Sequence, residues 1–164
     1  MMTILEKKGR LEGIKLAYVG DGNNVANSLI EASTLTGVKI HVATPEGYEP
    51  SEEVIEKAKT HTEVKLFNNP EEAVKEADVI YTDVWLSMGE EENVEKKRKL
   101  KDFQVNSQLL KRAKSDAIVM HCLPAHRGEE ITDEVIDGPQ SVVLEQAENR
   151  LHTSKAILEF LLAL

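Results

Sequence analysis

A carboxylate stands at the end of a short apolar run and is followed by a loop rich in hydrogen-bonding groups. Asp83 directly follows the run 79–82, and Ser87, Met88 and Gly89 come shortly after it. Because a partly buried carboxylate needs a partner, Asp83 could bind the amino group of a substrate. The segment 87–89 adds a hydroxyl, backbone groups and a hinge glycine, and such a loop could close over a small molecule. The alternative is that Asp83 only caps the turn that follows.

A thiol beside an imidazole, in the segment HCLPAHRGEE, is the second group that could do chemistry. Cys122 could be a nucleophile, which needs a lowered pKa and an oriented base. His121 is a poor candidate for that base, because adjacent residues on a strand point to opposite faces. His121, Cys122 and His126 could bind a metal, although they lack the paired ligands of ordinary zinc sites. The segment could also line a substrate site through hydrogen bonds, or bury a cysteine beside a capping histidine.

The segment GDGNNV begins like a dinucleotide-binding fingerprint but does not complete it. Its two glycines fit G-x-G, but Val25 stands where the third glycine or alanine belongs. The next apolar run ends in Thr44-Pro45, without the acid that would bind a ribose hydroxyl. The sequence therefore argues against a nucleotide site. Asn23 and Asn24 lie at the start of an expected helix, where one can cap and the other can face a ligand, or both can simply cap.

Apolar runs that alternate with amphipathic stretches must position these groups. We expect strands at 15–20, 38–43, 64–67, 79–82, 117–120 and 142–144, and helices at 24–36, 51–60, 70–76, 90–101 and 147–162. This alternation predicts an α/β fold, a single Rossmann-like domain with a doubly wound parallel sheet. Ligands of such sheets bind at the carboxyl ends of the strands. The segments 20–24, 44–48, 83–89, 121–126 and 145–150 should therefore share one edge.

Composition and charge exclude several classes of partner. The 164 residues suit one domain, and 20 basic against 29 acidic side chains give a net charge of −9. This charge disfavours nucleic-acid and anionic-membrane partners, and the basic run KKRKLK is expected to be a solvated helix face with the pairs Glu92–Lys96 and Glu95–Lys99. A lone cysteine, no signal peptide and no membrane-length apolar run favour a cytoplasmic protein.

Each motif alone is a weak signal, but the five motifs in this order form a specific pattern. GDGNN, ATPEGYEP, TDVWLSMG, HCLPAHRGEE and AENR have the order and spacing found in ornithine carbamoyltransferases. From about Ile4 to Leu164 the chain resembles the C-terminal, ornithine-binding domain of these enzymes, within the aspartate/ornithine carbamoyltransferase family. The resemblance implies transfer of a carbamoyl group from carbamoyl phosphate to the δ-amine of L-ornithine, a reaction of arginine biosynthesis and the urea cycle that gives citrulline and phosphate. It implies no cofactor and no metal.

The resemblance also implies roles for individual residues. Ornithine would be bound at four positions, which are Asn24, Asp83, Ser87 and Met88. Carbamoyl phosphate and the reacting atoms would be contacted by four others, which are His121, Cys122, Leu123 and Arg150. Of these, Cys122, His121 and Arg150 would be the catalytic groups, with His121 and Arg150 as donors to the charge that develops in the transition state. Holding two substrates together needs no covalent intermediate, so Cys122 would act as a contact rather than as a nucleophile.

One departure from the family pattern is large. Residues 1–164 contain no S-T-R-T-R motif, which the family uses to bind phosphate in its first domain. We therefore expect that the N-terminal carbamoyl-phosphate domain is missing, that the isolated chain is inactive, and that carbamoyl phosphate binds only with that domain. Two other functions stay open, a stand-alone amino-acid-binding module and a carbamoyltransferase for another amine such as putrescine.

The C-terminal stretch 156–164 is apolar on more than one face. In the enzymes that the chain resembles, the terminal helix packs on the first domain. Without that partner, part of the helix should be an exposed apolar patch. We expect a homo-oligomer that forms through this helix, or disorder beyond about Ser154.

Overall fold

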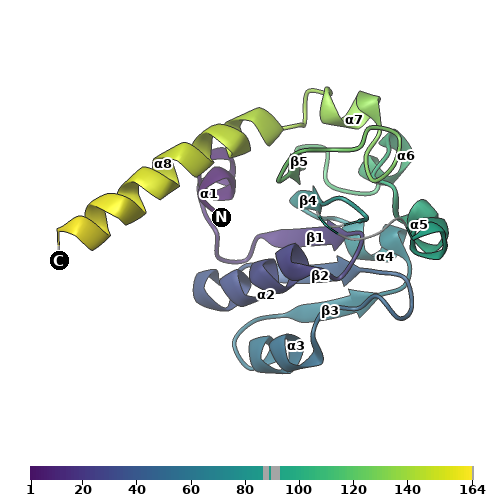
Figure 1. Cartoon of the computed structure of the whole chain (residues 1–164), viewed down its shortest axis with the longest axis horizontal. Helices are drawn as coiled ribbons and strands as arrows, with labels where there is room; N and C mark the ends of the chain where they lie inside the picture. The colour runs from purple at the N-terminus through teal and green to yellow at the C-terminus, as the bar shows by residue number, and fades with distance from the viewer. Residues whose placement is uncertain (87–88, 90–92, 164) are drawn as a thin grey trace.

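The computed structural model of the chain describes residues 1–86, 89 and 93–163. Within them, five parallel strands form one sheet in the order β3-β2-β1-β4-β5 (Figure 1). The strands are β1 (Lys15–Val19), β2 (Lys39–Ala43), β3 (Val64–Phe67), β4 (Val79–Thr82) and β5 (Ile118–His121). The helices are α1 (Met2–Lys8), α2 (Asn24–Thr36), α3 (Glu52–Lys59), α4 (Pro70–Val74), α5 (Val94–Leu100), η1 (Lys101–Phe103), α6 (Ser107–Leu110), α7 (Asp133–Ile136) and α8 (Val143–Leu162). This is the doubly wound α/β fold predicted from the sequence.

Both faces of the sheet are covered, which explains why its strands are apolar without strict alternation. On β1, Leu16 and Tyr18 face the cluster that includes Ile30 of α2 and Ile55 of α3. Ala17 and Val19 face the second cluster, which contains residues of α4, α6 and α7. Because helices cover both faces, the two ends of the strands are the uncovered parts of the sheet. The carboxyl end is therefore the place where polar loops can meet a ligand.

The expected sixth strand at 142–144 is wrong. Ser141 forms only an isolated bridge with Val119, and α8 begins at Val143. Val142 and Val143 are buried but Leu144 is 75% exposed, so the apolar run is the buried start of a helix. A run of three apolar residues is equally compatible with a strand and a buried helical turn, and the sequence pattern cannot separate them. The other expected elements are present, with ends that differ by a few residues, and residues 90–92 of the helix expected at 90–101 lie outside the described residues.

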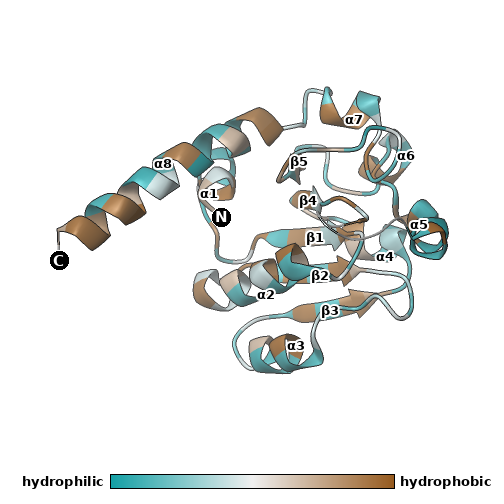
Figure 2. Cartoon of the chain, viewed as in Figure 1, coloured by the Kyte–Doolittle hydropathy of each residue, from teal (hydrophilic) through white to brown (hydrophobic). Residues whose placement is uncertain are grey.

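Helix α8 extends beyond the rest of the domain, and Figure 2 shows that its distal half is largely hydrophobic. All residues from 151 to 163 are exposed. The large apolar ones are Leu151, Ile157, Leu158, Phe160, Leu161 and Leu162. The helix continues to Leu162, so the expectation of disorder beyond Ser154 is wrong, and the expectation of an exposed apolar patch is confirmed.

In the described residues, no helix is long and apolar enough to cross a membrane.

Candidate functional site

The candidate site lies where the winding of the sheet reverses. Strand β1 pairs with β2 on one side and with β4 on the other, so the chain leaves β1 and β4 toward opposite faces. The loops after these strands diverge, and the carboxyl ends between them form the crevice in which doubly wound proteins bind ligands. Three side chains meet there: Asn23 after β1, Asp83 after β4 and Cys122 after β5.

Asn23 has a double role that its position at the start of α2 makes possible. Its Oδ1 accepts hydrogen bonds from the backbone N–H groups of Val25 (2.9 Å) and Ala26 (3.2 Å), so it caps the helix. The amide nitrogen must then face the other way, and Nδ2 donates to Asp83 Oδ2 over 2.8 Å. The prediction that one of the two asparagines caps the helix is confirmed. Asn24, the first residue of α2, is exposed.

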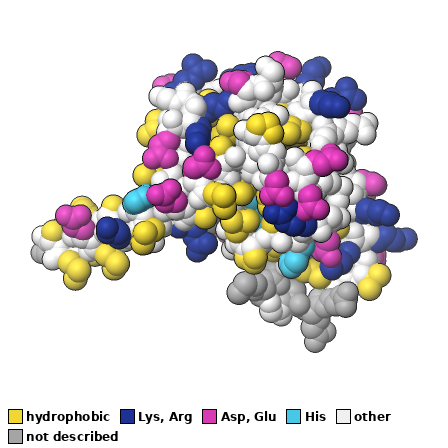
Figure 3. Space-filling view, turned by 90° about the horizontal axis from the view of Figure 1, so that it is seen from above, with side chains coloured by type: hydrophobic (Ala, Val, Ile, Leu, Met, Phe, Trp, Pro, Cys, Tyr) yellow, Lys and Arg dark blue, Asp and Glu magenta, His cyan; other side chains and the backbone are white. Residues whose placement is uncertain are grey.

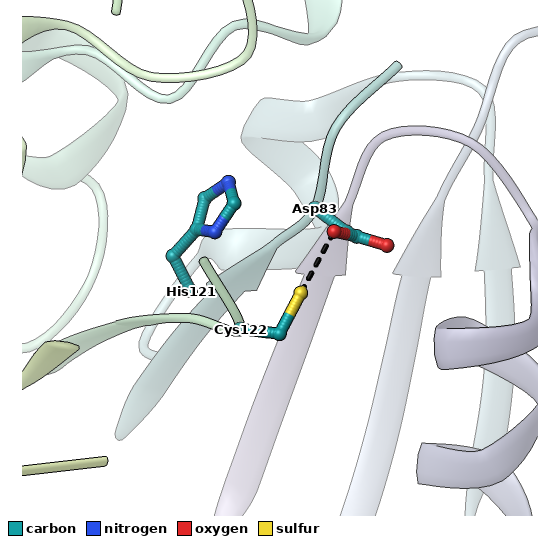
Figure 4. A group of neighbouring side chains, drawn as sticks. All are labelled: Asp83, His121 and Cys122. Carbon is teal, nitrogen blue, oxygen red and sulfur yellow. Dashed lines mark hydrogen bonds between the residues drawn. The ribbon is translucent and has the colours of Figure 1, made fainter. Parts of the chain in front are cut away.

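Asp83 is buried and is held by neutral donors. It is 6% exposed, and its Oδ1 accepts a 2.8 Å hydrogen bond from the Cys122 thiol (Figure 4). Among the described residues, Asp83 forms no ion pair with a lysine, arginine or histidine. A buried carboxylate that lacks a counter-charge has an electrostatic need for a cation, and an ammonium group meets that need.

Cys122 is a protonated thiol under ordinary conditions. Burial, together with the hydrogen bond to Asp83 and the charge of that carboxylate, raises the pKa of Cys122 to about 12. A nucleophilic cysteine needs the opposite shift. The geometry therefore favours the reading in which Cys122 donates a hydrogen bond, as expected from the sequence, over covalent catalysis.

His121 is fully buried, and both of its ring nitrogens are engaged. Nδ1 accepts a 2.9 Å hydrogen bond from the backbone N–H of Leu123, and Nε2 lies 3.1 Å from Glu130 Oε1. Because a backbone N–H can only donate, the ring proton of the neutral imidazole sits on Nε2 and faces Glu130. Glu130 is also fully buried and accepts a 2.6 Å hydrogen bond from the N–H of His126. His121 thus fastens its own loop and presents no free nitrogen to a ligand.

The loop that His121 fastens has an unusual backbone. Leu123 has φ of 55°, in the left-handed region that costs a residue with a Cβ roughly 1–2 kcal/mol. Such conformations persist where surrounding contacts determine them, and here the bond from Leu123 N–H to His121 is one of these contacts. The histidine before Cys122 therefore shapes the backbone after it.

Arg150 lies one turn of α8 beyond a residue that ties this helix to the sheet. Gln146 accepts a hydrogen bond from His121 N–H (3.0 Å) and donates one to the Tyr81 hydroxyl (2.9 Å). Arg150 and Gln146 line the same hollow of about 420 Å³, together with Tyr81. Arg150 is exposed, and within the described part of the chain its guanidinium has no hydrogen-bond or ion-pair partner. It is a free cation on the flank of the site.

The remaining predicted site residues, Ser87 and Met88, lie outside the residues that the structure describes. The run KKRKLK was expected to be a solvated helix face, and Arg98, Lys99 and Lys101 are exposed as expected, but the face is not solvated throughout. Lys96, in this run, is 6% exposed and forms a 2.8 Å ion pair with Asp21. Glu92, its expected partner, lies outside the described residues. Nothing in the spacing of the sequence links Asp21 to Lys96, because a contact between a turn and a helix far apart along the chain leaves no periodic signal.

Two groups of three side chains among the described residues have the ligand types that a metal requires. One is Asp83, His121 and Cys122, and the other is His126, Glu129 and Glu130, with ligand atoms within 4.8 Å of one another in each. The combination weighed from the sequence, His121 and Cys122 with His126, is neither of these. To bind a cation, the first group would have to release the bond to His121 Nδ1 and deprotonate a thiol whose pKa is about 12. A hydrogen-bonding site agrees better with this donor set.

Comparison with known proteins decides the family. Residues 12–161 match the Asp/Orn-binding domain of aspartate/ornithine carbamoyltransferases. The chain belongs to this family. The resemblance stated from the five motifs is thereby confirmed.

Close relatives agree in sequence and in structure. An ornithine carbamoyltransferase of Thermococcus kodakarensis is 59% identical over 162 residues, which cover 95% of this chain and 51% of the relative. The solved ornithine carbamoyltransferase of Pyrococcus furiosus superposes with a TM-score of 0.90 at 58% identity, over 96% of this chain and 52% of that one. The anabolic enzyme of Campylobacter jejuni, at 34% identity, has a TM-score of 0.89 over 98% of this chain and 55% of its own. The chain thus spans about half the length of these relatives.

Proposed function

We propose that this chain is the L-ornithine-binding half of an ornithine carbamoyltransferase. The single observation that carries the proposal is the buried Asp83 carboxylate, held by Asn23 and Cys122 and without a cationic partner among the described residues. Its charge suits an amino acid with an ammonium group. The family membership and the names of the close relatives support the same substrate.

In the proposed site, Asp83 binds the α-ammonium group of ornithine, and Asn24, Ser87 and Met88 complete the ornithine site. The neutral δ-amine of ornithine attacks the carbamoyl carbon, and phosphate leaves. Cys122 and Leu123 lie beside the reacting atoms, with the thiol acting as a hydrogen-bond donor. Arg150 is exposed and unpaired among the described residues, so its guanidinium is available to stabilise the leaving phosphate.

We assign His121 a positioning role instead of the direct contact expected from the sequence. Its side chain is fully buried, and its two nitrogens are engaged by Leu123 and Glu130. It would act through the backbone of the loop that carries Cys122 and Leu123.

The second half of the reaction needs a site for carbamoyl phosphate. Residues 1–164 carry no S-T-R-T-R motif, so we propose that a separate N-terminal domain supplies the phosphate-binding groups. We also propose a homo-oligomer and a cytoplasmic location, the latter because a lone cysteine suits a reducing compartment.

The first test compares the isolated chain with a chimaera in which residues 1–164 replace the matching half of the Pyrococcus furiosus enzyme. We expect no citrulline above the uncatalysed rate from the purified chain, because the phosphate-binding groups are missing, and measurable citrulline from the chimaera. Activity of the isolated chain would contradict the division of the site. A folded chimaera that binds putrescine but not ornithine in calorimetry would contradict the substrate.

The second test addresses Asp83 directly. In the chimaera, Asp83→Asn should weaken ornithine binding by about 1.5–3 kcal/mol, the usual worth of a hydrogen bond to a charged group. Calorimetry with ornithine measures the effect. Asp102→Asn, a change of an exposed aspartate in η1, is the matched control and should leave the affinity unchanged. An unchanged affinity in Asp83→Asn would show that Asp83 is only structural.

A further inference from the structure

A buried ion pair lies next to the site but is not part of it. Lys96 Nζ is 2.8 Å from Asp21 Oδ2, and the two side chains are only 8% and 10% exposed. Lys96 belongs to α5, which is the first helix after β4 among the described residues, whereas Asp21 belongs to the turn after β1. The pair therefore joins the two loops that diverge at the point where the winding of the sheet reverses.

The loop after β2, which contains Tyr48 and Pro50, packs beside the Lys96–Asp21 ion pair. The Tyr48 ring has two ammonium groups near its face, with Lys96 Nζ 5.8 Å and Lys99 Nζ 5.2 Å from the centroid. Gly22, beside Asp21, donates a 2.9 Å hydrogen bond to Tyr48 O. A Cβ at Gly22 would lie 2.3 Å from the nitrogen of Pro50, so the two backbones touch. Three loops are thus fixed against one another around Lys96.

From this junction, a short chain of hydrogen bonds leads to the reactive edge. Asp21 and Asn23 are separated by one residue, and the N–H of Asn23 bonds to Asp21 O over 2.8 Å. The Tyr18 hydroxyl donates to the same carbonyl over 2.8 Å. Asn23 then donates to Asp83, and Asp83 accepts from Cys122. The orientation of Asp83 therefore depends on the turn that carries Asp21 and Asn23, and Lys96 holds the Asp21 side chain of this turn.

Stability alone is a poor reason for this arrangement. Removing two charges from water costs several kcal/mol per ion, and apolar replacements of buried pairs are often neutral or stabilising. A buried pair does, however, restrict the geometry of the segments that carry it. Here these segments carry the candidate ligand groups.

We propose that Lys96 is a positioning residue for the Asp83 site: through its ion pair with Asp21 it fixes the turn that carries Asn23, and Asn23 holds the Asp83 carboxylate against Cys122. As far as the substrate is concerned, this inference rests on the proposed function. The geometric part concerns only residues of this chain and can be tested without any substrate.

Cys122 is the only cysteine, so its alkylation reports on the Asp83–Cys122 contact in the full chain. The test measures the rate of reaction with iodoacetamide between pH 7 and 10 in the parent and in Lys96→Met. If Lys96 positions Asp83, the variant loses the bond that keeps the thiol protonated. Its reaction at pH 8 should then be at least about tenfold faster, because the thiolate is the reacting form. A purely Coulombic effect of deleting a cation would slow the reaction, so the sign separates the two explanations.

Three further variants sharpen the test. Arg98→Met deletes a positive charge from an exposed position of the same helix and should react as the parent does. Lys96→Arg keeps the ion pair and should restore most of the parent rate. If Lys96→Met does not fold, as judged by circular dichroism and by the fluorescence of the only tryptophan, Trp85, then Tyr48→Leu decides. It removes the ring beside Lys96 without leaving a charge unpaired, and its reaction should also be faster than that of the parent.

A folded Lys96→Met chain that reacts at the parent rate, or more slowly, would overturn the proposal, as would an unchanged rate in Tyr48→Leu if the first variant does not fold. In the chimaera, Lys96→Met should raise the KM for ornithine about tenfold and leave the KM for carbamoyl phosphate unchanged. Equal changes in both would overturn the positioning role. A chimaera that binds no ornithine, combined with the expected change in alkylation, would refute the proposed function and leave the positioning of Asp83 intact.

Discussion

At the scale of single residues, the site depends on which groups carry charge. Asp83 is negative, buried and bound to neutral donors, and Cys122 beside it keeps its proton because burial and that carboxylate disfavour a thiolate. A thiolate beside Asp83 would repel it, whereas a thiol stabilises it. Asp83 and Cys122 together therefore carry a single negative charge, which one cationic group of a substrate can balance.

The raised pKa of Cys122 makes a direct prediction. At pH 7.5 the native chain should react with iodoacetamide at least about a hundredfold more slowly than in urea, where the thiol has its ordinary pKa. Asp83→Asn should accelerate the reaction of the native chain. Because the pKa in the folded state lies above the ordinary value of 9, the unfolded state loses its thiol proton first, and this contribution to stability falls as the pH rises through 9 toward 12. Rapid labelling of the folded chain at pH 7.5, with no difference in urea, would contradict the assignment.

Asp83 and Cys122, which the sequence analysis expected at one edge of the sheet, each lie next to a strand end. Asp83 and Cys122 follow β4 and β5 directly, so the rule for parallel sheets was enough to bring them to one edge. The engaged nitrogens of His121 could not be predicted, because Glu130 contacts it from nine positions along the chain through a loop without regular structure. Lys96 was missed for a similar reason, since a basic run predicts a solvated face unless a partner from another loop is known.

At the scale of elements, the loops of the carboxyl edge act as one packed unit. The backbones of two loops approach tightly at Gly22, where a Cβ would lie 2.3 Å from Pro50 N and 2.4 Å from both Glu49 C and Tyr48 O. A glycine in GDGNN permits a tight turn, because it has no Cβ. Its role in the structure also includes the approach of a second loop, which no pattern within the first loop could indicate.

Gly22→Ala should therefore destabilise the fold by roughly 1–3 kcal/mol, the usual cost of forcing an extra methyl group into a packed site. The neighbouring atoms belong to the backbone and cannot rotate away. Urea unfolding followed by circular dichroism measures the change. Ser28→Ala, at an exposed position of α2, is the control and should stay within about 0.5 kcal/mol of the parent. A Gly22→Ala chain as stable as the parent would mean that the two loops move apart easily.

The order of the strands and of the longer helices between them was predictable because strand and helix periodicities differ. The run 142–144 was misassigned, and the short elements α1, η1, α6 and α7 were not predicted. That run was ambiguous because Val142 and Val143 are buried while Leu144 faces solvent, a pattern that follows from where α8 docks and not from the run itself. Tertiary contacts decided the conformation there.

At the scale of the whole molecule, the chain presents one large feature that its own domain leaves uncovered. Helix α8 projects from the body of the protein, with hydrophobic side chains along it (Figure 3). Leu158, Phe160 and Leu161 are 59%, 66% and 59% exposed. Burying a leucine or phenylalanine side chain is worth about 1.5–3 kcal/mol, so leaving several exposed on one helix is costly. Contiguous apolar surface of this kind marks an interaction site.

We expect the isolated chain to associate through α8 at roughly tens of micromolar, most simply as a symmetric pair, because isologous contacts dominate small homo-oligomers. Ile157 and Leu161 are four residues apart and share a face of the helix, so Ile157→Glu with Leu161→Glu should place two charges in that contact and yield a monomer. Sedimentation velocity of the parent and of the double variant measures the difference. Leu35→Glu, a change at an 89% exposed leucine of α2, is the control and should associate as the parent does. A parent chain that sediments as a monomer at these concentrations would show that the exposed face of α8 does not bind a second copy.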